Sequence, residues 1–143
     1  MRPSTRPATV QPAGQLPIEL ILLRHVASYL EMPIFLVDAD GRLVFYNESA
    51  EPLLGSRFDE VGEMSTADWL AVFRPSKRRG RALPPNEVPL VMALRSQRAV
   101  HAALEITGVD GVRRPIEATA FPLRGHHGHL LGAIAIFWLS ETG

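Results

Sequence analysis

The sequence predicts an α+β fold in a single domain, on three observations. Two short runs of β-branched and aromatic residues, 34–37 and 43–46, are typical of strands. Helical spacing of apolar residues dominates the middle of the chain, and strand-like alternation dominates the last third, from residue 100 to residue 139. With 143 residues and 46% hydrophobic content, the chain has the size and composition of one globular domain.

Composition excludes several classes of function. Lys+Arg and Asp+Glu are balanced at 15 each, which argues against the basic surface that binds nucleic acid. The absence of cysteine excludes disulfides, thiolate catalysis and cysteine-based metal centres, and it fits the reducing cytoplasm. No apolar run approaches the roughly 20 residues that a membrane helix needs. We therefore expect a cytoplasmic protein that binds neither nucleic acid nor membrane.

The first segment, residues 1–17, is predicted to be a disordered tail because it is rich in proline and polar residues. A helix is expected next, over residues 18–30 of an N-terminal unit that spans 18–31. Pro17 favours its start, and Pro33 requires it to end earlier. Residues 32–143 are then expected to form the main domain.

Two apolar stripes run along this first helix. One stripe, with spacings of four and three residues, is made by Leu16, Leu20, Leu23, Ala27 and Leu30. The other is made by Ile18, Leu22, Val26 and Tyr29. The stripes lie roughly 120° apart around the helix axis. They indicate either one face for the chain's own domain and one for a second subunit, or a helix buried between core elements.

A tight turn over residues 38–41 is expected to join the two early strands, because its Asp-Ala-Asp-Gly sequence has turn chemistry. Asn47 or Ser49 is predicted to cap a short helix, and Gly55 is predicted to end it. These elements place the opening strands and a capped helix within one short window.

The middle of the chain is predicted to hold further helices. Short helices are expected within residues 58–72, with Ser65 or Thr66 capping one of them. Residues 74–81 form a polar loop, and a longer helix is expected from Asn86 to Arg98.

Three strands are expected in the last third, over residues 100–107, 114–123 and 130–139. The last of these is apolar on both faces. One face carries Leu131, Ala133, Ala135, Phe137 and Leu139, and the other carries Ile134, Ile136 and Trp138. Both faces must therefore be covered. The central helices can cover one, and the N-terminal helix or its copy in a dimer is the natural cover for the other.

The order of these elements resembles the PAS domain family of small sensor modules, over roughly residues 33–139. Three groups of residues carry the resemblance: Asp38-Ala39-Asp40-Gly41 followed by Asn47 and Leu53-Leu54-Gly55; Leu83-Pro84-Pro85 followed by Glu87, Pro89-Leu90 and Ala93-Leu94; and Asp110-Gly111 followed by Pro122-Leu123 and Leu131-Gly132-Ala133. The resemblance, to a stand-alone module of bacterial type, implies a five-stranded antiparallel sheet with helices on one face. The N-terminal helix would cover the other face or a dimer partner.

The sequence departs from the family pattern in three informative places. Gln97 or Arg98 stands where the family often has glycine after the long helix, and Pro115 stands where it often has an aromatic residue. The cysteine that flavin-binding photosensors of this family use for a covalent adduct is absent, which excludes that adduct. The long helix carries no histidine for haem, so haem is not expected, and Met92 would be a weak substitute. The cofactor, if one is bound, stays unknown.

The resemblance implies a non-enzymatic sensory or regulatory module that acts as a homodimer and signals to a separate effector protein. A small apolar or aromatic ligand would bind between the sheet and the long helix, in a pocket of Trp69, Phe73, Met92, Leu104 and Phe121. The dimer interface would contain Leu16, Leu20, Leu23, Ala27, Leu30, Ile134, Ile136 and Trp138. The alternative is a ligand-free protein–protein interaction module whose filled core is built from the same apolar residues.

Three other groups of side chains were weighed for chemistry. His126, His127 and His129 could bind a transition metal, but a solvated hairpin loop explains them as well, and no metal site is expected. The basic loop could meet an anionic partner or simply be solvated; its cations are Arg74, Lys77, Arg78, Arg79 and Arg81. His25 is expected to be an ordinary helix residue. The carboxylates are scattered, so no catalytic residue is predicted.

Overall fold

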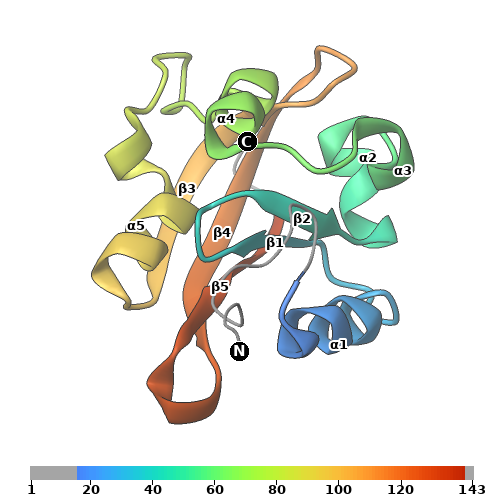
Figure 1. Ribbon diagram of the computed structural model, residues 1–143. Coiled ribbons are helices and arrows are strands. Elements are labelled where there is room, and N and C mark those ends of the chain that lie inside the picture. The colour runs from blue at the N-terminus through green and yellow to red at the C-terminus, as the bar shows by residue number, and fades with distance from the viewer. Residues whose placement is uncertain (1–15, 141–143) are drawn as a thin grey trace.

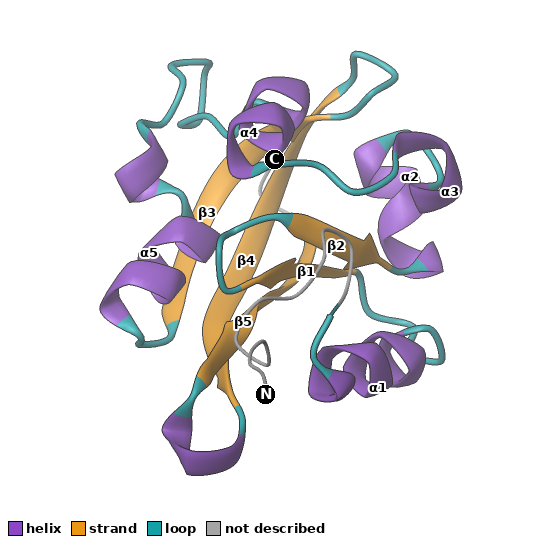
Figure 2. Cartoon of the chain, viewed as in Figure 1, coloured by secondary structure: helices purple, strands orange, loops and turns teal. Residues whose placement is uncertain are grey.

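A five-stranded antiparallel sheet forms the centre of the computed structural model, which describes residues 16–140 (Figures 1 and 2). The predicted tail, apart from its last two residues, lies outside this described range. The strand order is β2-β1-β5-β4-β3. The strands are β1 (Ile34–Asp38), β2 (Leu43–Tyr46), β3 (Val100–Thr107), β4 (Arg113–Arg124) and β5 (Leu130–Leu139). The predicted α+β class and five-stranded sheet are confirmed.

Helices lie on both faces of the sheet. Four of them pack on the face that we call the inner face: α2 (Glu51–Leu54), α3 (Phe58–Val61), α4 (Thr66–Phe73) and α5 (Pro89–Ser96). One helix, α1 (Ile18–Ala27), packs on the opposite, outer face. Short 3₁₀ turns add η2 (Glu48–Ala50), η3 (Pro85–Glu87) and η4 (His126–Gly128). No helix within residues 16–140 has the length and apolar character to cross a membrane.

The first half of the inner layer forms as the local sequence predicts. The side chain of Asn47 accepts a hydrogen bond from the backbone N–H of Ala50, at 3.2 Å, and so caps η2. Gly55 ends α2 with a φ of 79°, a conformation that glycine adopts without a steric penalty. The side chain of Ser65 accepts from the N–H of Asp68 at 3.2 Å and caps α4.

The long helix is shorter than predicted. It begins at Pro89, whose missing N–H is tolerated in a first turn, and Asn86 lies in the preceding 3₁₀ turn. It ends at Ser96 because Gln97 adopts the left-handed conformation, with a φ of 56°. Arg124 donates hydrogen bonds to the backbone and side-chain oxygens of Gln97, at 3.2 and 2.7 Å. These contacts stabilise a turn that lacks the usual glycine.

A β-bulge in β5 changes which face one side chain occupies. The register between β4 and β5 shifts beside Gly132, whose φ is 158°. A Cβ atom at Gly132 would lie 2.0 Å from the carbonyl oxygen of Val37, so only glycine fits there. The bulge turns Leu131 to the outer face, where it packs with Ile134. The prediction that Leu131 shares a face with Ala133 was therefore wrong.

Pro115 lies within β4 without disrupting the pairing of β3 and β4. It faces Glu105, whose own N–H and carbonyl bond to Ser76 on the other side of β3, at 2.9 and 2.8 Å. Glu105 therefore requires no hydrogen bond from the nitrogen of Pro115. Pro115 therefore fits within β4 without a bulge in the pairing with β3.

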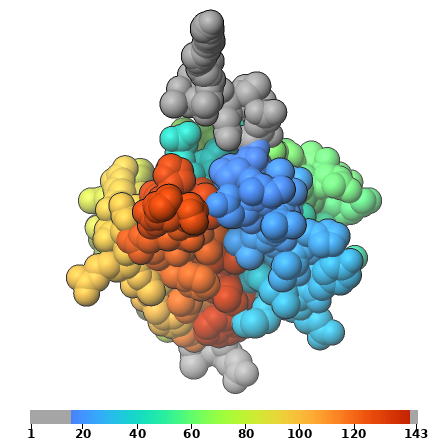
Figure 3. Space-filling view, turned by 60° about the horizontal axis from the view of Figure 1, so that its bottom comes forward, coloured from blue at the N-terminus to red at the C-terminus, as the bar shows by residue number. Residues whose placement is uncertain are grey.

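Helix α1 ends at Ala27, three residues before the predicted end, and it uses its two stripes differently. Leu20 and Ala27 are 0% and 1% exposed, in a cluster with outer-face residues of β1, β2 and β5. Leu16 and Leu23 pack against the same cluster. The second stripe is exposed: Ile18 is 63%, Leu22 58%, Val26 53% and Tyr29 75% accessible. Figure 3 shows α1 beside the β4–β5 hairpin on this face.

The dimer interface stays a prediction, but this arrangement limits which of its residues could reach a second subunit. Leu20, Ala27 and Ile134 are buried in the same cluster between α1 and the sheet. They cannot contact a second subunit while α1 stays docked. Leu30 lies beyond the end of α1 and is 45% exposed. Trp138, also 39% exposed, lies near the open end of the outer face. The apolar surface that stays accessible in this region is therefore the second stripe, together with Leu30 and Trp138.

Candidate functional site

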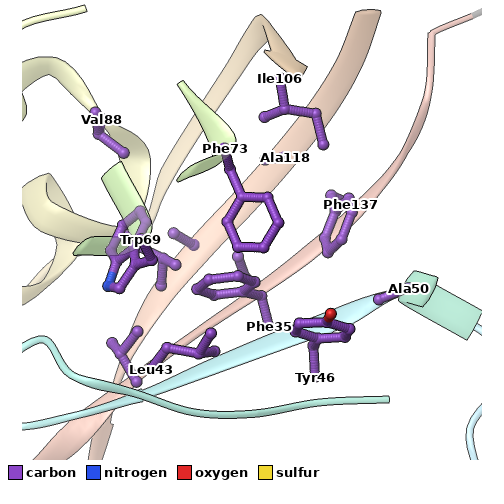
Figure 4. Close-up of a cluster of buried hydrophobic side chains, with 14 of the residues drawn as sticks. Phe35, Leu43, Tyr46, Ala50, Trp69, Phe73, Val88, Ile106, Ala118 and Phe137 are labelled. Atoms are coloured by element: carbon purple, nitrogen blue, oxygen red, sulfur yellow. The ribbon is translucent and has the colours of Figure 1, made fainter. Parts of the chain in front are cut away.

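A cavity of about 60 Å³ lies between the inner face of the sheet and helices α4 and α5. Its walls come from the strands, from the two helices and from the segments before them. The lining residues are Phe35, Leu54, Trp69, Phe73, Pro75, Val88, Pro89, Leu90, Leu104, Ile106, Ile116, Ala118, Ala135 and Phe137. Figure 4 shows Phe35, Phe73 and Phe137 converging from the sheet and from α4. All of the lining side chains are apolar or aromatic.

Aromatic rings set the shape of this cavity. The ring of Phe35 meets the rings of Trp69 and Phe73 edge to face, at centroid distances of 5.2 and 6.0 Å. This geometry is the favoured one for aromatic pairs. The indole N–H of Trp69 donates to the carbonyl oxygen of Gly41 at 2.8 Å, so the one polar atom of that side chain is already bonded. The side chains of the wall therefore leave no polar group that needs a hydrogen bond from a ligand.

The chemistry of the wall restricts what the cavity can hold. Its volume is several times the ~10–15 Å³ that admits one water molecule, but water needs two or more polar partners to stay. A charged or strongly polar ligand would lose its hydration without compensation. The wall suits a small, uncharged, apolar molecule. An aromatic ring would enter only if the lining side chains moved, because the cavity that holds benzene in another protein measures about 150 Å³.

The structure brings together three of the five predicted pocket residues. Trp69, Phe73 and Leu104 line the cavity, whereas Met92 is half-buried on α5 and does not line it. Phe121 packs on the outer face with the α1 cluster, which corrects its predicted place. Its neighbour Ala120 faces inward, and successive residues of a strand face opposite sides.

Several cavity residues were missed, although strand alternation could have found them. Phe35 of β1, Ile116 and Ala118 of β4 and Phe137 of β5 all point to the inner face. Each belongs to the inward-facing set of its strand, so the strand patterns held the information. The sequence did not show which strands would lie behind the helices.

Tyr46 is the buried ionisable group next to the aromatic cluster. It is 1% exposed, and its hydroxyl donates to the carbonyl oxygen of Ser56 at 2.8 Å. Burial raises the pKa of Tyr46 well above its ordinary value, and the carboxylates of Glu51 and Glu60 raise it further. The phenol therefore stays protonated near neutral pH and acts as a structural donor.

The cavity does not fit a flavin or a haem. A flavin ring carries polar atoms along one edge, and this cavity has no polar side chain to meet them. Neither His25, on the outer helix α1, nor Met92 lines the cavity as a haem ligand would. The rings of His126 and His127 lie 4.0 Å apart in the β4–β5 loop, but no group of three metal-ligating side chains occurs within residues 16–140.

Comparison with known proteins gives consistent results. A family model described as the PAS fold matches residues 28–138 of the chain. No curated protein matches the sequence. Among solved structures, the PAS domain of a protein from Colwellia psychrerythraea is similar, with 16% identity and a TM-score of 0.61, over 87% of this chain and 99% of that one.

Two light-responsive proteins are also similar. The light-oxygen-voltage (LOV) protein of Rhodobacter sphaeroides has 15% identity and a TM-score of 0.65, over 89% of this chain and 71% of that one. The light-state dimer of the fungal blue-light photoreceptor Vivid has 15% identity and a TM-score of 0.60, over 91% of this chain and 99% of that one. At such identities the similarity concerns the fold alone.

Proposed function

Because this chain belongs to the PAS-fold family, whose members are generally sensory or signalling modules, we propose that it is a non-enzymatic sensor of a small apolar ligand. The observation that carries the proposal is the wholly apolar cavity between the sheet and helices α4 and α5. The ligand would be uncharged, and aromatic or aliphatic, because the wall offers only apolar contacts.

The signal would pass from the cavity to α1 through strand β1. Phe35 lines the cavity, while its neighbours Ile34 and Leu36 pack in the α1 cluster on the other face. A ligand changes such a system only if it binds two packing states with unequal affinity. Movement of Phe35 on binding would shift the surface on which α1 rests, and so bias the position of the helix.

Output would depend on a homodimer formed through the exposed stripe of α1, Ile18, Leu22, Val26 and Tyr29. An apolar stripe of this kind marks an interaction surface. The similar photoreceptor Vivid, whose light state is a dimer, supports this part of the proposal. The dimer would then act on an effector protein in the cytoplasm.

The ligand proposal is tested by native mass spectrometry of the purified protein and by thermal unfolding with indole or toluene. A bound ligand at about 100 times its Kd stabilises the folded state by about 2.7 kcal/mol, so we expect a rise in Tm of several degrees. Ala118→Leu fills the cavity from β4 and should abolish the rise. Ala103→Leu, exposed on β3, is the matched control and should retain it.

The second candidate function is a ligand-free dimerisation module, and the exposed stripe of α1 favours it independently of the cavity. A bare polypeptide mass, together with no rise in Tm for either probe, would reject the sensor and leave this candidate. Leu22→Glu should convert a dimer to a monomer in light-scattering measurements. Val109→Glu, an apolar residue of 48% exposure in the β3–β4 turn, should leave the dimer intact.

A further inference from the structure

A second hollow, of about 310 Å³, lies on the surface beyond Pro75. It is bounded by the end of α4, by the hairpin of residues 75–83 and by the first residues of β4. Its lining combines apolar side chains, from Leu70, Pro75 and Leu83, with the cations Arg74 and Arg113. We call this hollow the cationic groove.

The hairpin that walls the cationic groove is held rigidly against the sheet. Ser76 and Glu105 exchange backbone hydrogen bonds of 2.8 and 2.9 Å, so the hairpin extends the β3 edge. The backbone N–H of Lys77 donates to the carbonyl oxygen of Arg81 at 2.7 Å. The backbone N–H of Leu83 donates to the carbonyl oxygen of Pro75 at 2.9 Å. This surface is therefore preorganised, and the hairpin would lose little conformational entropy when a partner binds.

Positive charge is concentrated in the segment that forms this groove. Five of the chain's 15 basic residues lie within residues 74–81, and no acidic residue occurs between Asp68 and Glu87. Of these five, Arg74 lines the groove, and the other four belong to the hairpin that walls it. Arg113 adds a further cation from β4 and bonds to Glu105. Because the whole chain has no net charge, this corner is a local exception rather than part of a general basic surface.

Two of these arginines occupy backbone positions that suit other residues better. Arg74 and Arg79 have φ angles of 44° and 71°, in the left-handed region. A residue with a Cβ atom is strained there, and glycine or asparagine would be less strained. At Arg74 this conformation ends α4, as the same conformation at Gln97 ends α5.

We infer that the cationic groove docks an acidic peptide segment of a partner protein. An apolar side chain of the segment would rest on Leu70, Pro75 and Leu83, while its carboxylates meet Arg74 and the hairpin cations. Nucleic acid fits less well, because the groove has no aromatic ring on which a base could stack. The inference rests on the proposed function for the existence of a partner, and it adds the chemistry of that partner.

The test is fluorescence anisotropy with a labelled peptide of alternating glutamate and serine around one central leucine. We expect binding that weakens as NaCl is added. The double variant Arg79→Glu and Arg81→Glu should bind at least about tenfold more weakly. The control, Arg95→Glu with Arg98→Glu, changes the net charge equally at exposed positions on and after α5 and should retain affinity within about threefold.

Changes in the probe test the groove without altering the protein. Glutamine in place of glutamate should abolish binding, and serine in place of the central leucine should weaken it about fivefold or more. The inference is overturned if the acidic peptide does not bind, if the hairpin variant and the control weaken alike, or if an oligouridine of equal charge binds more tightly. Indole binding, measured on the same samples, reports the proposed sensor function separately from peptide docking.

Discussion

The two faces of the sheet are covered in different ways. On the inner face, four helices bury 21 residues in one continuous cluster that surrounds the cavity. On the outer face, the single helix α1 covers β1 and its neighbours, and the corresponding cluster holds seven buried residues. Beyond α1 the outer face becomes polar, with His101, Glu117 and Thr119 joined by hydrogen bonds.

This difference predicts that the outer helix opens more readily than the inner layer. Local opening of a protein draws on regions with few buried apolar contacts. Helix α1 contributes only Leu20 and Ala27 as fully buried residues, so its undocking should cost far less than opening the inner layer. The inner layer is suited to hold a ligand, and the outer helix is suited to move.

The largest effect is expected for Phe35→Ala on the inner face. Phe35 is 6% exposed and packs against three aromatic rings, so its truncation should lower the free energy of unfolding by about 4 kcal/mol. Urea unfolding measures this loss. A loss below that of the outer-face variant Leu20→Ala would contradict the ranking of the two layers.

Asn47→Ala is expected to come second, because Asn47 joins the two layers. Its side-chain oxygen accepts from the N–H groups of Ile34 and Ala50, and its amide lies 2.8 Å from the carbonyl oxygen of Met32 and 3.1 Å from that of Ala27. Leaving buried backbone groups unpaired should cost about 3 kcal/mol in urea unfolding.

Ser49→Ala is the control for this variant. The hydroxyl of Ser49 donates to the carbonyl oxygen of Leu30 at 3.3 Å, and the residue is partly accessible. The Ser49→Ala substitution should change the free energy of unfolding by no more than about 0.5 kcal/mol. If both variants lose the same stability, the link between the layers does not depend on Asn47.

Leu20→Ala should destabilise the protein by about 2 kcal/mol, at the low end for a buried leucine, because α1 can shift to close the gap. Hydrogen exchange should show faster opening of α1 with little change in β4 and β5. Leu22→Ala, at 58% exposure on the same helix, is the control and should have almost no effect on exchange of the monomer. Uniform acceleration across the sheet would mean that the layers open together.

The smallest effect on stability is expected from acid titration of the β3–β4 turn, which donates hydrogen bonds to the carbonyl oxygens at the end of α2. Arg114 and the N–H of Val112 bond to Asp110 and lower its pKa below the ordinary value of 3.8. Its contribution to stability is therefore present above that ordinary pKa and is lost as the pH falls through the lowered one. Asp110→Asn should remove this small acid-dependent part, measured by urea unfolding at several pH values. A difference from wild type that is constant with pH would contradict it.

Local signals in the sequence were enough to predict the caps and ends of the first helices of the inner layer. Asn47, Gly55 and Ser65 act where caps and helix ends were predicted, because each depends on neighbours within a few residues. The face of Leu131 was not predictable, since the bulge at Gly132 depends on contact with Val37, far away in the sequence.

The candidate site was predicted only in part for a related reason. Trp69 and Phe73 follow from the apolar pattern of one helix, whereas the exclusion of Phe121 requires the face of β4 to be known. The two stripes of α1 were found by periodicity, but periodicity alone does not tell which stripe faces the sheet. Burial in the fold makes that choice, and it is a long-range property.

The strand order also has a consequence for synthesis on the ribosome. Strand β1 pairs with β5, and α1 packs against residues of both, yet β5 is translated roughly a hundred residues after α1. Until β5 emerges, the stripe of α1 that contains Leu20 and Ala27 lacks part of its cover, and both stripes are then open to chaperones. A nascent chain stalled before Leu130 should therefore bind chaperone through α1, and release should coincide with the arrival of the last strand.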